Sequence, residues 1–219
     1  INEIKKLLEL DSTNLQALND LAQTYSLLNN TKAETETLER ILEIDPTNGT
    51  ALLILSDTYR ANGETEKAFD VTKKAFQSTS LNIDSKMRRL LSYYDLGTDT
   101  SILKYAFELI EVLKQTHPSD AKPFTIAGDY YYRSNEFQLA ATNFEKALEF
   151  DPSRYPIWQQ LMIIYFDFKD YEKVASLAQR CLELFPSQTT AYYFSGLANL
   201  QLKNYEKSMK SRCSKINFK

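Results

Sequence analysis

This chain of 219 residues repeats a pattern of residue types every 34 positions. Pro118, Pro152 and Pro186 are 34 residues apart, whereas Pro46 and Pro118 are separated by 72, the length of one 34-residue repeat and one of 38. The same offset relates aromatic residues, namely Phe124, Trp158 and Tyr192, then Tyr131 and Tyr165, then Phe137, Tyr171 and Tyr205. Such a period predicts small supersecondary units that bury their apolar faces on one another.

Each repeat predicts two helices. One apolar set is Phe124, Ala127, Gly128 and Tyr131, and the next is Phe137, Ala140, Phe144 and Ala147. Within each set the residues recur every three or four positions, the spacing of one helix face. Because Gly128 and Ala140 are small, the two helices can approach closely while Phe144 fills the remaining volume. Each repeat therefore predicts an antiparallel helical hairpin.

This order of residue types resembles the tetratricopeptide repeat, in which the second helix ends at a proline. The resemblance implies an all-α fold, a right-handed superhelical solenoid of antiparallel helix-turn-helix repeats. It covers the whole chain as one domain, 1–219, in which 1–14 is the second helix of a truncated repeat. The repeats are 15–48, 49–82, 83–120 (irregular), 121–154, 155–188 and 189–219 (partial).

Composition restricts the partner. The net charge of −3 and the pI near 5.4 argue against nucleic acid, because nucleic-acid binders gain most of their affinity by neutralising phosphates. Apolar runs such as Leu161 to Phe166 are far shorter than a membrane-spanning helix, so a soluble chain without a transmembrane segment is expected. The compartment is not indicated, although a cell-envelope or periplasmic location stays open for a bacterial protein of this kind.

Catalytic chemistry is not expected. The only histidine, His117, stands beside Pro118 in a turn that joins two repeats, which disfavours a nucleophile–histidine pair. Cys181 occupies the small-residue position shared with Ala147, so we expect a buried thiol. The five glycines form no phosphate-binding loop. We therefore predict no enzyme activity, no cofactor and no metal.

The resemblance implies that partners bind a concave wall made of first helices. By alignment, the residues that point into this groove are Lys122, Thr125, Asp129, Tyr132, Arg133, Gln159, Ile163, Phe166, Tyr193, Leu197 and Leu200. Tyr132, Phe166 and Leu200 are 34 apart and predict an apolar ladder that docks a partner. Alternatively, these side chains pack between adjacent first helices.

The leading hypothesis is a non-catalytic protein-interaction scaffold that holds a peptide or a partner helix in the groove. It lacks the lysine and asparagine clamp by which one subtype of the family binds acidic chaperone tails, because Asn19 and Gln23, for example, stand at those positions. Two alternatives remain. The chain could be the regulatory or recruiting arm of a larger protein with its catalytic domain elsewhere, or a module that self-associates into a homo-oligomer.

Overall fold

The computed structural model describes residues 1–95, 100–204 and 206–208, which form two compact units, 1–116 and 117–219. The first unit contains α1 (Asn2–Leu10), α2 (Leu15–Leu27), α3 (Thr31–Ile44), α4 (Gly49–Ala61), α5 (Thr65–Gln77), α6 (Ile83–Asp95) and α7 (Thr100–Thr116). The second contains α8 (Ala121–Arg133), α9 (Phe137–Phe150), α10 (Tyr155–Asp167), α11 (Tyr171–Leu184) and α12 (Thr189–Gln201). No strand occurs in the described ranges.

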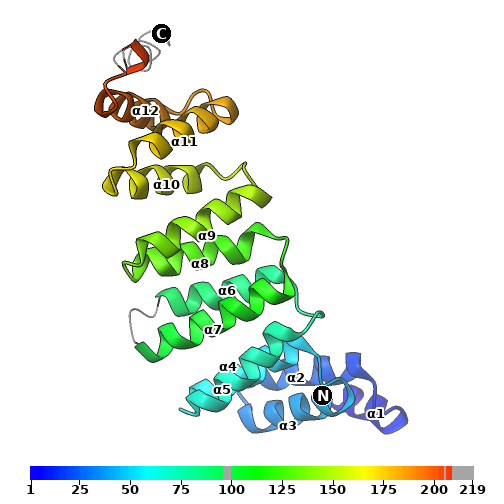
Figure 1. Ribbon diagram of the computed structural model, residues 1–219. Coiled ribbons are helices and arrows are strands. Elements are labelled where there is room, and N and C mark those ends of the chain that lie inside the picture. Colours follow the sequence, from blue (N-terminus) through cyan, green and yellow to red (C-terminus); the bar gives the residue numbers. More distant parts are fainter. Residues whose placement is uncertain (96–99, 205, 209–219) are drawn as a thin grey trace. The chain divides into compact units, whose positions relative to one another are not determined.

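Consecutive helices pair as antiparallel hairpins. α2 packs on α3 and α4 on α5 in the first unit, and α8 packs on α9 and α10 on α11 in the second (Figure 1). The second helix of one hairpin then packs on the first helix of the next, as α3 does on α4 and α9 on α10. We call each such junction a seam. The predicted all-α fold of stacked helix-turn-helix repeats is thus confirmed within each unit.

The turns between helices are specified by local chemistry. Asp45 and Asp151, each followed by proline, accept hydrogen bonds from the backbone N–H groups of Thr47 (3.0 Å) and Ser153 (3.1 Å). Asn48 then caps α4 by accepting from the N–H of Ala51 at 3.0 Å. These bonds use backbone groups that a helix end leaves unpaired, so the Asp-Pro sequences end one helix and position the next.

Five of the hairpin turns within the described residues contain one residue in the left-handed conformation. These residues are Asn29 (φ 52°), Gly63 (φ 80°), Asn135 (φ 61°), Lys169 (φ 61°) and Lys203 (φ 59°). Asparagine and glycine tolerate this conformation, whereas lysine adopts it at a cost of about 1 kcal/mol. The 34-residue period therefore extends to the backbone of the turns.

The cores lie between the helices of each unit. In the second unit Phe144, Trp158 and Cys181 are at most 1% exposed, and the Trp158 indole donates to the carbonyl of Pro152 at 2.8 Å. In the first unit the corresponding core is built on Leu18 and Ile41. Burial raises the pKa of the Cys181 thiol to about 11. The prediction that Cys181 is a buried residue is confirmed.

The repeat predicted as irregular departs from the pattern. There α5 packs on α7, where the ring of Phe69 stacks on that of Tyr105 at 4.1 Å. The turn that leads into this repeat lacks the Asp-Pro pair. It is held instead by Lys86, whose buried ammonium donates to the carbonyl of Ser78 at 2.9 Å. The predicted longer turn at 97–98 and, in the predicted partial repeat 189–219, residues 205 and 209–219 lie outside the described residues.

Candidate functional site

The predicted groove residues all belong to the first helices of the second unit. We call the side of a unit on which these positions lie its first-helix face. They are Lys122, Thr125, Asp129, Tyr132 and Arg133 on α8, Gln159, Ile163 and Phe166 on α10, and Tyr193, Leu197 and Leu200 on α12. Tyr193 and Leu200 are 53% and 39% exposed, and the other nine are half-buried. The two most accessible apolar groups of the set are therefore on α12.

Two members of the predicted ladder also take part in packing. The ring of Tyr132 lies edge-on to that of Phe137 with centroids 5.2 Å apart, and Phe166 meets Tyr171 in the same way at 5.6 Å. Phe166 also contacts Phe194 of α12 at 5.8 Å, which joins two first helices. Tyr132 and Phe166 therefore pack partly against the core of the second unit, whereas Leu200 is exposed.

A charged cluster surrounds Thr125 on α8. Arg154, in the turn between α9 and α10, donates from Nη1 to the Thr125 hydroxyl at 3.2 Å and pairs through Nε with Asp151 at 3.4 Å. Arg154 and Lys122 both line a cavity of about 260 Å³ beside the start of α8. The sequence prediction missed Arg154 because this residue precedes its helix. The signal available in the sequence was its position directly after the Asp-Pro turn.

Asp129 is the group in this region whose pKa is most strongly shifted by burial. Burial raises the pKa of its carboxyl to about 6, although the positive charge of Arg154 opposes this effect. The carboxylate of Asp129 is thus ionised at neutral pH and takes up a proton in mildly acidic solution. The charge of this part of the first-helix face depends on pH.

The first unit carries a pocket on its own first-helix face. Its volume is about 570 Å³, and its lining comprises Gln16, Asn19, Ala22, Gln23, Ser26, Glu34, Leu38, Asn48, Thr50 and Ile54. Ala22 and Leu38 are buried and form an apolar base, whereas the Asn19 and Gln23 amides are exposed. Among the described residues lining this pocket, Glu34 alone carries a charge. Amides beside an apolar base suit an uncharged polar ligand.

This pocket and the predicted groove use the same repeat positions. Gln16, Asn19, Gln23 and Ser26 precede Lys122, Thr125, Asp129 and Tyr132 by 106 residues each, which is the offset between the repeats that start at 15 and 121. The predicted site was chosen by its aromatic positions, so the pocket of the first unit was missed. The register would have found it, because equivalent positions of stacked repeats face the same side.

Neither a metal cluster nor a membrane-spanning helix occurs among the described residues. No group of three or more histidine, cysteine, aspartate or glutamate side chains there could hold a metal ion. No helix in the same part of the chain is long and apolar enough to cross a membrane.

Comparison with known families identifies the repeats. The sequence profile described as tetratricopeptide repeat matches residues 15–48 and 121–154, which are the bounds predicted for two of the repeats. The chain thus contains tetratricopeptide repeats at these two segments. Both matched tetratricopeptide segments form complete hairpins, α2–α3 and α8–α9, one in each unit.

One curated protein and two solved structures are similar to this chain. A curated relative, BBSome complex member BBS4 of Bos taurus, is 25% identical over 156 residues, which are 71% of this chain and 29% of that protein. The chain therefore spans under a third of the relative's length. The solved structure of YrrB, described as a TPR protein with an unusual peptide-binding site, is 17% identical with a TM-score of 0.52 and covers 87% of this chain and 96% of its own. A solved mutant of MamA has 15% identity, the same TM-score and coverages of 78% and 96%.

Proposed function

We propose that this protein is a non-catalytic scaffold that binds an extended peptide or a partner helix on its first-helix faces. The observation that carries the proposal is the pocket of about 570 Å³ between α2 and α4, lined by Asn19 and Gln23 at groove positions. Side-chain amides both donate and accept hydrogen bonds, so they can pair with the main chain of an extended peptide. Exposed Tyr193 and Leu200 offer an apolar contact on the second unit's own first-helix face.

The comparisons support a role in assemblies. The curated relative is named as a member of a complex, and the solved YrrB structure is described as having a peptide-binding site. The similarity to these two proteins is compatible with a part for this chain in a larger assembly.

The test compares three double variants in one binding assay. Asn19→Ala with Gln23→Ala removes the amides of the first unit, and Tyr193→Ala with Leu200→Ala removes the exposed apolar groups of the second. The control is Gln138→Ala with Glu172→Ala, which changes exposed residues on the second helices α9 and α11. Circular dichroism first checks that all three are as helical as the wild type.

Ligands are selected from a random-peptide display library with the wild-type protein and are measured by isothermal titration calorimetry. Two lost amide contacts cost about 2 kcal/mol together, so we expect at least one first-helix-face variant to bind about 10-fold or more weakly. The control variant should keep the wild-type Kd. If both first-helix-face variants bind the selected peptides as tightly as the wild type, the proposal is wrong. Sedimentation velocity over a range of protein concentrations tests the self-association alternative.

A further inference from the structure

The seams carry a repeated set of three side chains on the side of the second helices. In the seam of α9, α10 and α11 the Tyr165 hydroxyl donates to Oε1 of Glu145 at 2.7 Å. The Lys173 ammonium donates to the same hydroxyl at 3.1 Å and lies 3.7 Å from the Glu145 carboxylate. We call Glu145, Tyr165 and Lys173 the seam triad. It links the three helices through these contacts.

A second seam has the same residue types at the same register. In the seam of α3, α4 and α5 these positions are Glu39, Tyr59 and Lys67, each 106 residues before its counterpart in the seam triad. The Lys67 ammonium lies 5.7 Å from the centroid of the Tyr59 ring and also pairs with Glu64. A lysine therefore covers the tyrosine in this seam too.

The seam of α1, α2 and α3 differs, and it is open. Its three positions are Lys5, Tyr25 and Ala33, each 140 residues before Glu145, Tyr165 and Lys173. The glutamate is thus replaced by lysine and the lysine by alanine. A pocket of about 420 Å³ remains, lined by Lys5, Leu8, Glu9, Leu21, Tyr25, Ala33, Glu36, Thr37 and Arg40. The short side chain of Ala33 leaves unfilled the volume that Lys173 occupies in the other unit.

A second cavity lies at the same repeat positions, which supports the link between loss of a triad residue and an open pocket. In the seam of α11 and α12 the triad positions are Gln179, Asn199 and Lys207, so the tyrosine is replaced by the shorter asparagine. All three line a pocket of about 650 Å³. Loss of a triad residue therefore coincides with a cavity in both seams.

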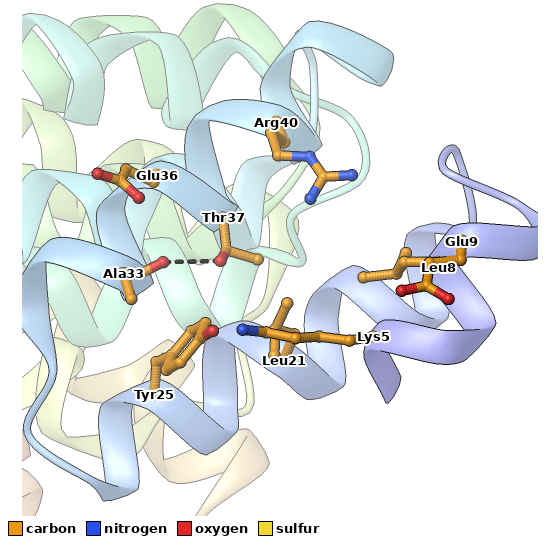
Figure 2. Close-up of a pocket in the computed structure, with 9 residues that line it drawn as sticks. All are labelled: Lys5, Leu8, Glu9, Leu21, Tyr25, Ala33, Glu36, Thr37 and Arg40. Atoms are coloured by element: carbon orange, nitrogen blue, oxygen red, sulfur yellow. Dashed lines mark hydrogen bonds between the residues drawn. The ribbon is translucent and has the colours of Figure 1, made fainter. Parts of the chain in front are cut away.

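The open seam retains two of the three chemical groups of the triad. Figure 2 shows the Lys5 side chain extending across the pocket, with its ammonium directed toward Tyr25. Lysine and tyrosine are thus both present, although the lysine comes from α1 and not from α3. The missing group is the carboxylate that accepts from the tyrosine hydroxyl in the seam triad.

The other charged groups of the pocket lie away from the Lys5 ammonium. Glu36 and Arg40 occupy adjacent turns of α3 across the pocket, and their side chains point in different directions (Figure 2). The Arg40 guanidinium donates to the Ser12 carbonyl at 3.3 Å. Glu9 stands at the other end of the Lys5 side chain from the ammonium (Figure 2). Leu8 and Leu21 are 8% and 3% exposed and give the pocket an apolar floor.

We propose that this pocket binds a glutamate side chain of a partner protein, whose carboxylate accepts hydrogen bonds from the Lys5 ammonium and the Tyr25 hydroxyl. The methylene groups of glutamate suit the floor formed by Leu8 and Leu21, and the carboxylate completes the set that Glu145 completes within the second unit. The site shares no lining residue with the first-helix-face pocket, so it is distinct from that pocket and does not depend on the proposed function.

The experiment is an NMR titration of the full chain with two short peptides. The probes are acetyl-Gly-Glu-Gly-amide and acetyl-Gly-Gln-Gly-amide, which differ only in the carboxylate, and sodium acetate as a free anion. One carboxylate pair in an open pocket gives millimolar affinity, so saturable shifts of the Lys5, Tyr25 and Thr37 resonances are expected with the glutamate peptide. The glutamine peptide should bind about 10-fold more weakly.

Variants assign the contact to atoms. Lys5→Met keeps the apolar stem and removes the charge, and Tyr25→Phe removes only the hydroxyl, so each should weaken binding about 5-fold or more. Glu36→Gln removes from the pocket a negative charge that repels the carboxylate of the peptide, so this variant should bind the glutamate peptide more tightly. Lys5→Glu with Ala33→Lys installs the seam triad, so it should abolish peptide binding and raise the melting temperature.

Three results overturn the proposal. The first is equal binding of the glutamate and glutamine peptides, or no saturable shift at tens of millimolar peptide. The second is unchanged affinity in Lys5→Met and Tyr25→Phe when both variants are folded. The third is acetate binding as tight as that of the glutamate peptide, which would assign the pocket to free anions. None of these results bears on the variants of the first-helix faces.

Discussion

The ring of Phe144 on α9 occupies the space where residue 128 of α8 would carry a side chain. A Cβ atom added at Gly128 would lie 2.4 Å from Cδ1 and Cε1 of that ring. Phe144 is 1% exposed and belongs to the core of the second unit, so the ring has little room to move away. The absence of a side chain at position 128 therefore sets how closely α8 and α9 approach.

Gly128→Ala should destabilise the protein. The added methyl group overpacks a filled core, and we expect the free energy of unfolding to fall by about 1–3 kcal/mol in urea denaturation, despite the better helix propensity of alanine. Adding Phe144→Leu should relieve the clash, so the double variant should lose less stability than the sum of the two single variants. Simple additivity would contradict the close approach.

Lys169→Gly should stabilise the hairpin of α10 and α11. Lys169 has φ 61°, a conformation in which a side chain costs about 1 kcal/mol and glycine costs almost nothing. We expect a gain of about 0.5–1 kcal/mol in thermal denaturation. Gly63→Ala is the converse test, because nothing lies within 4 Å of an added Cβ there and its φ of 80° alone should destabilise. A stability gain from Gly63→Ala would refute the conformational explanation.

Asp129 should make stability depend on pH. Its folded-state pKa is raised from 3.8 to about 6, so the folded protein keeps a proton that the unfolded chain has lost between these values. The stronger proton binding of Asp129 in the folded state stabilises the protein. This contribution to the free energy of unfolding is complete below about pH 4 and is lost as the pH rises through about 6. Relative to Asp129→Asn, the wild type should lose stability over this interval in urea denaturation. Parallel pH profiles for the two proteins would contradict the raised pKa.

Replacing Phe166 and replacing Leu200, two residues of the predicted ladder, should lower the free energy of unfolding by different amounts. Phe166 touches Tyr171 and Phe194, so Phe166→Ala should lower the free energy of unfolding by about 2–3 kcal/mol, slightly less than for a fully buried phenylalanine. Leu200 is 39% exposed, and Leu200→Ala should cost less than about 1 kcal/mol. Chemical denaturation of the two variants measures how much each side chain contributes to stability, and so distinguishes a residue that packs in the core from one that is free to contact a partner. Equal costs would mean that Leu200 is a core residue as well.

Most of the fold could be predicted from the sequence because the signals are local. The spacing of Phe124 and Tyr131 indicates a helix face, and the Asp-Pro turn at Asp151 ends one helix and starts the next. The groove residues were placed on first helices by the same register. Their exposure could not be predicted, because whether Phe166 or Leu200 meets solvent depends on which ring of the next hairpin lies against it.

The sequence by itself determined the repeat, the helical hairpins and the positions at which the hairpins meet, because helix periodicity and turn chemistry act over a few residues. Only the tertiary structure decided which seams are filled and which are open. The space between three helices depends on side chains such as Lys5 and Ala33, which are 28 residues apart in sequence and meet at one pocket. The space left between helices depends on all the side chains around it, and these come from different repeats. The sequence of one repeat is therefore not enough to predict whether a seam is filled or open.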